Sequence, residues 1–327
     1  MLTVYVPGSA GLYSFPPAPG LPVPPEVVWI DLYQPVTAEV HRVEQALDIA
    51  LPTREEMQEI EASSRLYQED GAVFMTAVVL AQSDTEHPET TAVTFILSGE
   101  RLVTVRHAEP KPFRAFATRA SRQQGLKTGD VILVNLLETV IERAANILER
   151  EMARVDAISS EVFNHTPTGQ RRVNQAESRD FQEILRDIGQ TGDVASRARE
   201  SLMSIGRLLA FLDQGLPSQG QEARAQVKIM WRDVQSLLDH ATFLAGKISF
   251  LLDATLGMVN IEQNSIIKIF SVVSVVFLPP TMIASIYGMN FELMPELKWA
   301  LGYPWALFLM LMSAVVPFLY FKRKGWL

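Results

Sequence analysis

The chain has 327 residues, a formal net charge of −8 and no cysteine. This length allows two or three domains, and the lack of cysteine excludes disulfides and thiolate metal sites. The five histidines are scattered along the sequence without ligand spacing. Any bound metal must therefore use oxygen ligands, which suits Mg²⁺ better than a softer ion.

Charge is divided unevenly along the chain. Residues 266–327 contain five Lys or Arg and two Asp or Glu, which leaves 24 basic and 35 acidic side chains in residues 1–265. An acidic body of this kind disfavours nucleic acid as a partner. It is compatible with the attraction of divalent cations.

Residues 1–125 are expected to form a mixed α/β cytosolic domain. Helical patterns cover Thr37–Ala50 and Thr53–Ser63, with Thr53 and Glu56 at capping-box spacing. A proline-rich loop, Pro16–Pro25, separates the first two of five short β-branched runs. We expect strands in these five runs: Leu2–Val6, Val27–Leu32, Ala72–Ala81, Thr91–Leu97 and Leu102–Arg106.

Catalytic chemistry has little support in the sequence. Gly8–Gly11 is too short and poorly placed for a phosphate loop and is interpreted as a turn, and no GxxxxGK[ST] motif occurs. Glu55 and Glu56 are adjacent on a helix and do not face each other, so a solvated helix start is expected. No nucleophile with a plausible base is found. We therefore expect neither an enzyme nor a bound nucleotide.

Residues 126–265 change to long helices and are expected to form a cytosolic stalk region. Asp130 can cap a helix over Val131–Phe163, and a second helix over Arg171–Leu212 would pair with it in antiparallel fashion. A third helix runs without a break from Glu222 to Tyr287, about 100 Å at ~1.5 Å per residue. One small domain cannot support such a helix, which favours a bundle of several subunits.

Two apolar runs near the C-terminus predict membrane spans at residues 266–287 and 299–321, each about 20 residues long. An external loop, 288–298, joins them, and a basic tail, 322–327, follows. Lysine and arginine gather at the ends opposite the loop, so the positive-inside rule predicts two cytoplasmic termini. No signal peptide is expected, and Leu2 stands where N-myristoylation requires glycine.

The first span carries a stripe of small or polar residues along one face. Steps of three and four residues keep a position on one side of a helix, and a polar stripe within a membrane must face protein or water. Helix packing by small residues is the competing interpretation. We call this face the polar stripe: Asp253, Gly257, Asn260, Asn264, Ile267, Ser271, Ser274, Leu278, Thr281, Ser285 and Gly288.

The end of the first span resembles a known family. Tyr287-Gly288-Met289-Asn290, then Phe291–Leu297 and the closing Lys-Arg-Lys-Gly-Trp-Leu, is similar to the CorA family of magnesium channels. The resemblance is close from about Arg232 onward and looser before it. It implies an α+β chain that forms a funnel-shaped homopentamer in the cell inner membrane, with the first spans lining the pore and lipid around the second spans. It also implies potential-driven uptake of Mg²⁺, and of Co²⁺ and Ni²⁺.

The resemblance implies roles for individual residues. Asn290 would be the selectivity element, presented by the turn at Gly288 and Met289; a helix C-cap is the alternative for Asn290. Leu278 would form a hydrophobic constriction, unless it only packs in the core. The other candidates are pore rings at Asp253, Asn264, Ser271, Ser274 and Thr281, cation attraction by Glu292 and Glu296, and a basic cytoplasmic ring at Lys322, Arg323 and Lys324.

The family closes when intracellular Mg²⁺ bridges acidic residues of neighbouring subunits. The candidate sensors here are Asp233 and Asp239 on the stalk, with Asp84 and Glu86 as partners, although each is also a plausible solvated surface carboxylate. Three alternatives to a magnesium channel remain: a zinc transporter of the same superfamily, a two-span receptor with a coiled-coil stalk, and a membrane-anchored enzyme.

Overall fold

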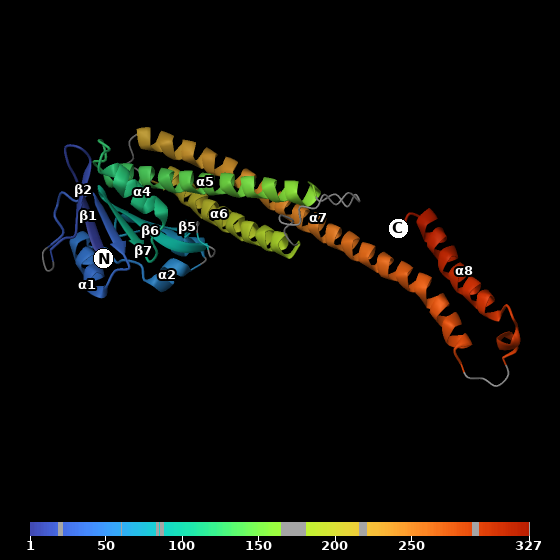
Figure 1. Ribbon diagram of the computed structural model, residues 1–327. Coiled ribbons are helices and arrows are strands. Elements are labelled where there is room, and N and C mark those ends of the chain that lie inside the picture. The colour runs from blue at the N-terminus through green and yellow to red at the C-terminus, as the bar shows by residue number, and fades with distance from the viewer. Residues whose placement is uncertain are drawn as a thin grey trace. The chain divides into compact units, whose positions relative to one another are not determined.

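The chain divides into two compact units, Met1–Leu252 and Asp253–Leu327, and helix α7 (Gln221–Tyr287) contributes residues to both. The first unit contains a β-sheet and long helices, and the second contains the end of α7 and helix α8 (Gly302–Arg323) (Figure 1). The computed structural model describes residues 1–18, 22–59, 61–82, 85, 88–164, 181–215, 221–289 and 294–326.

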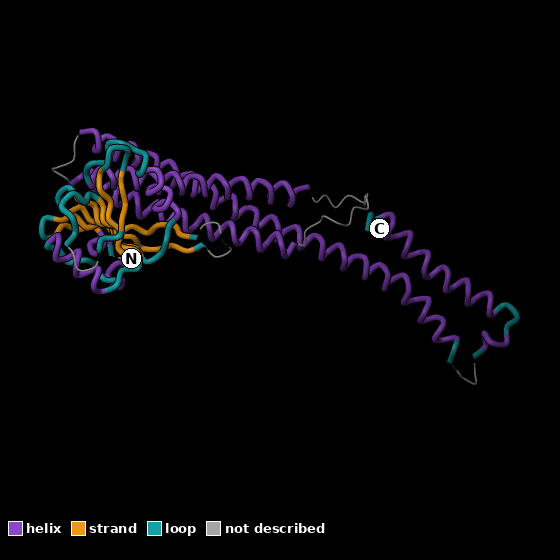
Figure 2. Tube along the Cα trace, turned by 60° about the vertical axis from the view of Figure 1, so that its left-hand side comes forward, coloured by secondary structure: helices purple, strands orange, loops and turns teal. Residues whose placement is uncertain are grey.

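The sheet has seven strands in the order β2-β1-β3-β7-β6-β5-β4. Figure 2 shows the strands in orange, beside the helices of the same unit. Every neighbouring pair is antiparallel except β3 and β7, which run parallel at the centre. The strands are β1 (Leu2–Pro7), β2 (Leu12–Phe15), β3 (Trp29–Tyr33), β4 (Leu66–Glu69), β5 (Ala72–Ala81), β6 (Glu89–Ser98) and β7 (Arg101–Arg106).

All five predicted strands are confirmed, and the bounds of β5 agree residue for residue. Strand β5 is buried along its whole length, which explains its continuous apolar sequence. Strands β2 and β4 were missed. Both have four residues, lie at the two edges of the sheet and are largely exposed, so neither carries a hydrophobic alternation long enough to recognise.

Helices cover both faces of the sheet. Val43 of α1 (Thr37–Leu47) and Met57 of α2 (Arg54–Gln58) join the core beneath one face. Phe113 and Phe116 of α4 (Lys111–Ala120) lie on the other face, where the ring of Phe116 is 5.5 Å from that of Trp29. Helix α4 was not predicted from the sequence.

The predicted helix Thr53–Ser63 is wrong: the segment forms two short helices, α2 and α3 (Ala62–Arg65). Its start is correct, because the Glu56 backbone N–H donates to Thr53 Oγ1 (3.3 Å) and the Thr53 N–H donates to a Glu56 carboxylate oxygen (2.8 Å). The helix ends early because Glu59 has extended ψ of 141°. Helix α1 also stops before the predicted Ala50, since Asp48 is left-handed, with φ of 53°.

A buried ion pair connects the two central strands. Arg106 of β7 donates from Nε and Nη2 to the two carboxylate oxygens of Asp31 in β3, at 3.0 and 2.8 Å. Thr104 Oγ1 also donates to Asp31 Oδ1 (2.8 Å) and accepts from Trp29 Nε1 (3.0 Å). The Arg106 guanidinium lies over the Phe113 ring, 5.0 Å from its centre, which ties α4 to the same pair.

Helix α5 (Gly129–Asn164) starts where it touches the sheet. A Cβ on Gly129 would lie 2.4 Å from the backbone of Arg101 and Leu102, so only glycine permits this approach of α5 to β7. The prediction that Asp130 caps this helix is wrong. The helix begins at Gly129, one residue before Asp130, so Asp130 lies in its first turn.

The long helices α5, α6 (Phe181–Gly215) and α7 are held together by polar and aromatic contacts as well as by apolar packing. Arg154 near the end of α5 faces Asp187 near the start of α6 at 3.9 Å, as expected for an antiparallel pair. Lys247 of α7 pairs with Asp156 of α5, and the rings of Phe163 and Phe250 stack at 6.0 Å. The predicted unbroken third helix is confirmed by α7.

The buried ion pair should be a main determinant of domain stability. We expect Asp31→Ala to lower the free energy of unfolding by about 3–5 kcal/mol, because it leaves the Arg106 charge buried without a partner. Glu142→Ala is the control, since Glu142 lies 3.9 Å from Arg119 in an exposed pair, and its removal should cost less than about 1 kcal/mol. Thermal and urea unfolding of the purified protein measure both. Equal losses in the two variants would contradict this assignment.

Candidate functional site

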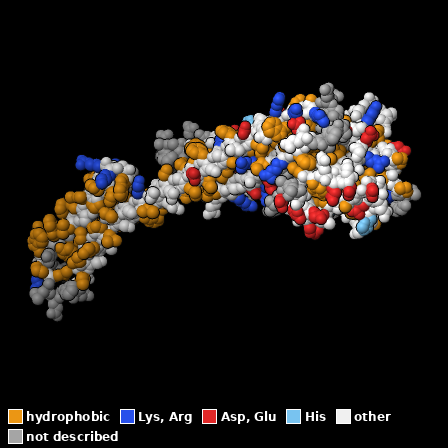
Figure 3. Space-filling model, turned by 180° about the vertical axis from the view of Figure 1, so that it is seen from behind, with side chains coloured by type: hydrophobic (Ala, Val, Ile, Leu, Met, Phe, Trp, Pro, Cys, Tyr) orange, Lys and Arg blue, Asp and Glu red, His pale blue; other side chains and the backbone are white. Residues whose placement is uncertain are grey.

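The second unit consists of two helices that are long and apolar enough to cross a membrane: the C-terminal part of α7 and α8. Figure 3 shows hydrophobic side chains over most of the visible surface of this unit. Water would strongly disfavour such a surface, whereas lipid chains cover it without cost. Helix α8 begins at Gly302, and the predicted loop before it includes a short 3₁₀ helix, Pro295–Lys298.

One face of α7 packs toward α8, which lies beside it in both views (Figures 1 and 2). From Ser271 to the end of α7, the residues with reduced exposure lie on one side of the helix: Val272, Val276, Pro279, Pro280, Ile283 and Tyr287. On α8, Gly302 and Ala306 are buried. Helix α8 also contacts the 3₁₀ helix Pro295–Lys298.

The polar stripe lies on the face of α7 opposite to α8. Successive helical residues are about 100° apart, which puts the centre of the stripe roughly half a turn from the face centred on Val272. Every member of the stripe between Asp253 and Gly288 is exposed in the described chain, while Val272 is only 3% exposed. The stripe therefore does not serve to pack α7 against α8.

The hydroxyl groups of the stripe bond to their own helix. Ser271, Ser274 and Thr281 each donate to the carbonyl oxygen four residues earlier, at 2.7, 2.8 and 2.7 Å. The donor of each hydroxyl is thus occupied, and its oxygen retains lone pairs that point away from the helix backbone. A row of such oxygens can accept hydrogen bonds from water, including the water bound to a cation.

Leu278 interrupts this row of oxygens. It lies between Ser274 and Thr281 on the stripe, and its side chain is 68% exposed. Asn264 and Asp253 continue the stripe toward the first unit, and both are exposed. The face thus presents polar groups on both sides of Leu278, and Ile267, between Asn264 and Ser271, is a second large apolar side chain on it.

The signature turn is described only in part. The Gly288 backbone N–H donates to the Ala284 carbonyl (2.9 Å) and the Met289 N–H to the Ile286 carbonyl (3.2 Å), so these two residues complete the last turn of α7. Asn290 and Glu292 lie outside the described residues, as does the side chain of Glu296.

The other candidate residues are distributed over both units. Asp233 and Asp239 are exposed on α7, whereas Asp84 and Glu86 lie outside the described residues. Lys322 and Arg323 occupy the last turn of α8, and Lys324 is its C-cap. Within the described part of the chain, no three His, Asp or Glu side chains are grouped closely enough to hold a metal ion. A site for a regulatory ion would have to include other residues or other subunits.

Comparisons with known proteins agree over nearly the whole chain. A family model described as "CorA-like Mg2+ transporter protein" matches residues 25–323. The magnesium transport protein CorA of Escherichia coli (strain K12) is 39% identical over 302 residues, which cover 92% of each chain.

Two solved structures share the fold at low identity. The complete CorA magnesium transporter of Methanocaldococcus jannaschii has a TM-score of 0.77 at 19% identity and covers 100% of this chain and 99% of its own. The ZntB cytoplasmic domain from Vibrio parahaemolyticus has a TM-score of 0.58 at 8% identity over 80% of this chain and 98% of its own. These likenesses concern the fold alone. The family model and the Escherichia coli relative favour the magnesium alternative over the zinc one.

The resemblance that the signature turn indicated is therefore confirmed at the level of the family. Its members are membrane ion transporters rather than enzymes, which agrees with two apolar C-terminal helices and a mixed α/β domain followed by long helices. The match over residues 25–323, together with 39% identity to a relative that it covers almost completely, shows that this chain belongs to the CorA-like Mg²⁺ transporter family.

Proposed function

We propose that this chain is the subunit of a channel that conducts Mg²⁺ into the cell through the inner membrane, with both termini in the cytoplasm. The observation that carries the proposal is the polar stripe of α7, which is exposed on the face opposite to α8. Membership of a Mg²⁺ transporter family supports the choice of ion.

The stripe requires more than one subunit. A row of Ser271, Ser274 and Thr281 oxygens facing lipid would leave acceptors without hydrogen bonds, which the hydrocarbon core disfavours. Several copies of α7 around an axis remove this cost by enclosing water between their stripes. The relation to CorA proteins supports a homopentamer, in which each stripe residue becomes a ring of five and α8 lies outside among lipids.

The membrane potential supplies the driving force. A divalent ion that crosses an inside-negative membrane gains about 4.6 kcal/mol per 100 mV, twice the value for a single charge. Inward transport therefore requires no nucleotide.

Selection at the outer mouth is assigned to Asn290, held by the turn at Gly288 and Met289. Mg²⁺ loses its water reluctantly, and a ring of carboxamide oxygens can accept hydrogen bonds from the hydrated ion without removing its shell. Glu292 and Glu296 in the same loop would raise the local cation concentration. Hydrated Co²⁺ and Ni²⁺ would enter by the same contacts.

The polar stripe also supplies the residues that we assign to the inner parts of the ion path. Asn264 and Asp253 would form the cytoplasmic end, and rings of Ser271, Ser274 and Thr281 would bind the hydration shell. A ring of Leu278 side chains would constrict the pore and gate it by dewetting. We assign the basic residues 322–324 to a cytoplasmic ring near the lipid headgroups.

Passive accumulation requires a means of closure. We assign this to intracellular Mg²⁺ that bridges carboxylates of neighbouring subunits, with Asp233 and Asp239 on one side and Asp84 and Glu86 as partners. The two stalk residues are exposed, and neither has an ion pair within the described residues. Their charges are therefore available to a cation.

Cysteine labelling tests whether the stripe faces water. The chain has no cysteine, so single-cysteine variants need no altered background. In liposomes, Ser274→Cys should react with a charged methanethiosulfonate reagent at least about tenfold faster than Val315→Cys, because the reactive thiolate requires water. Val315 is the matched control, on the side of α8 away from its α7-facing residues. Equal protection of both would indicate a dry packing face and refute the pore assignment.

Flux measurements test selection at Asn290. In liposomes with an internal Mg²⁺-sensitive dye and an inside-negative potential, the unmodified protein should give rapid Mg²⁺ entry. Asn290→Ala should reduce the rate at least about tenfold, since each lost hydrogen bond to a charged group contributes about 1.5–3 kcal/mol. Lys298→Arg is the control, a loop change that keeps both the charge and the proposed filter. Entry of Zn²⁺ but not Mg²⁺ would instead support a zinc transporter.

Removal of the proposed sensor should abolish closure. We expect the double variant Asp233→Ala/Asp239→Ala to conduct at internal Mg²⁺ concentrations that close the unmodified channel, because neutral side chains cannot hold a bridging cation. Glu183→Ala, in an exposed position on α6 and without an ion pair within the described residues, provides the matched loss of a carboxylate. Unchanged closure in the double variant would refute this pair as the sensor.

A further inference from the structure

A pocket in the first unit carries chemistry that cation transport does not use. Its volume is about 510 Å³, within the range of small-molecule sites. It opens between α2, the adjoining ends of strands β6 and β7, and α6. The residues around it that bear charge or can form hydrogen bonds are Arg54, Gln58, Arg65, Glu89, Thr90, Thr91, His107 and Glu200.

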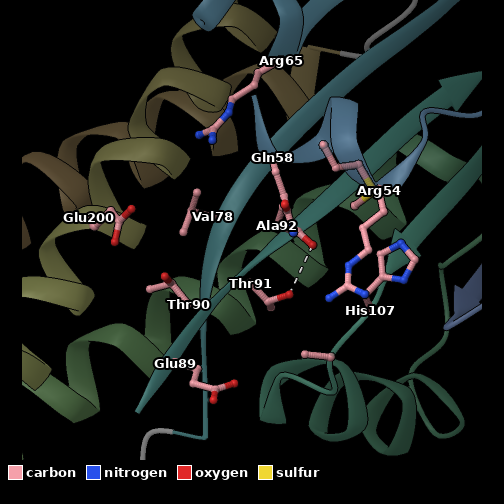
Figure 4. A pocket seen from close by; sticks show the side chains of 12 residues that line it. Arg54, Gln58, Arg65, Val78, Glu89, Thr90, Thr91, Ala92, His107 and Glu200 are labelled. Carbon is pink, nitrogen blue, oxygen red and sulfur yellow. Dashed lines mark hydrogen bonds between the residues drawn. The ribbon is translucent and has the colours of Figure 1, made fainter. Parts of the chain in front are cut away.

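Arg54 and His107 together form a cationic side of this pocket. Figure 4 shows the two side chains next to each other, apart from Glu200 and Glu89. Within the described part of the chain, the structure gives neither side chain a hydrogen bond or an ion pair. The guanidinium of Arg54 is exposed, so a ligand from solution can reach it.

The electrostatics of His107 agree with this arrangement. Its partial burial is the main cause that lowers the pKa of the imidazole, the positive charge of Arg54 lowers it further, and Glu55 opposes both effects. The imidazole is thus held near a positive charge that no carboxylate in contact neutralises. A bound anion would relieve this repulsion and restore the proton on His107.

The nature of the lining indicates what the ligand would be. Arginine offers a planar fork of N–H donors that matches the oxygens of a phosphate, and it cannot bind a metal cation. The opposite rim has hydroxyl groups of Thr90 and Thr91 and the carboxylates of Glu89 and Glu200. Arg65 also lines the pocket, and its Nε donates to the backbone carbonyl of Glu59. The Glu89 and Glu200 carboxylates can accept hydrogen bonds from hydroxyls and repel negative charge, so the anionic end of the ligand is placed at Arg54 and His107.

We propose that this pocket is a binding site for a small phosphomonoester, whose phosphate contacts Arg54 and His107 and whose hydroxyl groups contact the Thr90, Thr91 and Glu200 side. This inference does not rest on the proposed transport function. It adds a ligand class that the cation path does not require, in the cytosolic part of the chain.

Calorimetry tests the site on the full-length protein in detergent. Ribose 5-phosphate is titrated at constant ionic strength in Mg²⁺-free buffer, with inorganic phosphate and ribose as separate probes. We expect saturable binding of ribose 5-phosphate, weaker binding of inorganic phosphate and none of ribose. Arg54→Gln and His107→Gln should each weaken binding about tenfold or more. Arg114→Gln, an exposed arginine on α4 outside the pocket, should leave binding unchanged.

Histidine NMR supplies a second measurement that does not depend on binding heat. With ¹³C-labelled histidine, the signal lost in His107→Gln identifies His107 among the five histidines. Its pKa should rise when ribose 5-phosphate binds, and it should also rise in ligand-free Arg54→Gln.

Absence of saturable binding, equal binding of inorganic phosphate, or binding unchanged in both pocket variants would overturn the proposal. None of these outcomes bears on Mg²⁺ flux, which the liposome assay measures separately.

Discussion

The membrane interior offers no water to a polar group, and this constraint governs the arrangement of α7. Three hydroxyls of the stripe satisfy their donors on their own helix, at Ser271, Ser274 and Thr281. Their acceptor lone pairs still need partners. Because α8 occupies the opposite face, the stripe is free to face water or another copy of the chain, as the proposed pore requires. In that proposal, oligomerisation follows from where the polar residues lie on α7.

The continuity of α7 gives the membrane span a mechanical link to the cytosolic unit. The helix is unbroken from Gln221 to Tyr287, although Pro279 and Pro280 each lack a backbone donor. In the first unit α7 is attached to α5 by the Lys247–Asp156 pair and the stacking of Phe163 on Phe250. A change in the packing of α5 would therefore act on the same helix that carries the stripe.

Prediction from sequence succeeded where the signal was long and periodic. The ten buried residues of β5 and the 67 residues of α7 both follow from patterns repeated several times. The failures were short or depended on tertiary contacts. Strand β2 is a short edge strand, α2 ends at Gln58 because Glu59 is extended, and the start of α5 at Gly129 is set by contact with the Arg101 backbone.

The candidate site residues also fall into those that a local sequence pattern can reveal and those that only the fold brings together. The stripe could be read from one helix because its residues share a face, and the turn at Gly288 and Met289 could be found because its residues are contiguous. Arg54 and His107 are 53 positions apart in the sequence and were not predicted, since only the sheet brings the end of β7 beside α2. The same limit applies to any sensor formed between subunits, because one sequence does not state which of its residues meet a second copy.

The acidic surface of the first unit and the cationic side of the phosphomonoester pocket favour ligands of opposite charge. The first 265 residues carry 35 acidic and 24 basic side chains, so their overall field attracts Mg²⁺ and repels anions. Salt screens this field within about 8–10 Å, whereas direct contacts with Arg54 and His107 are not screened once a ligand displaces water. A compact anion can therefore bind where a polyanion, whose further charges would face Glu89 and Glu200, is excluded. The acidic surface thus attracts cations from a distance, whereas the cationic side of the pocket binds an anion by direct contact.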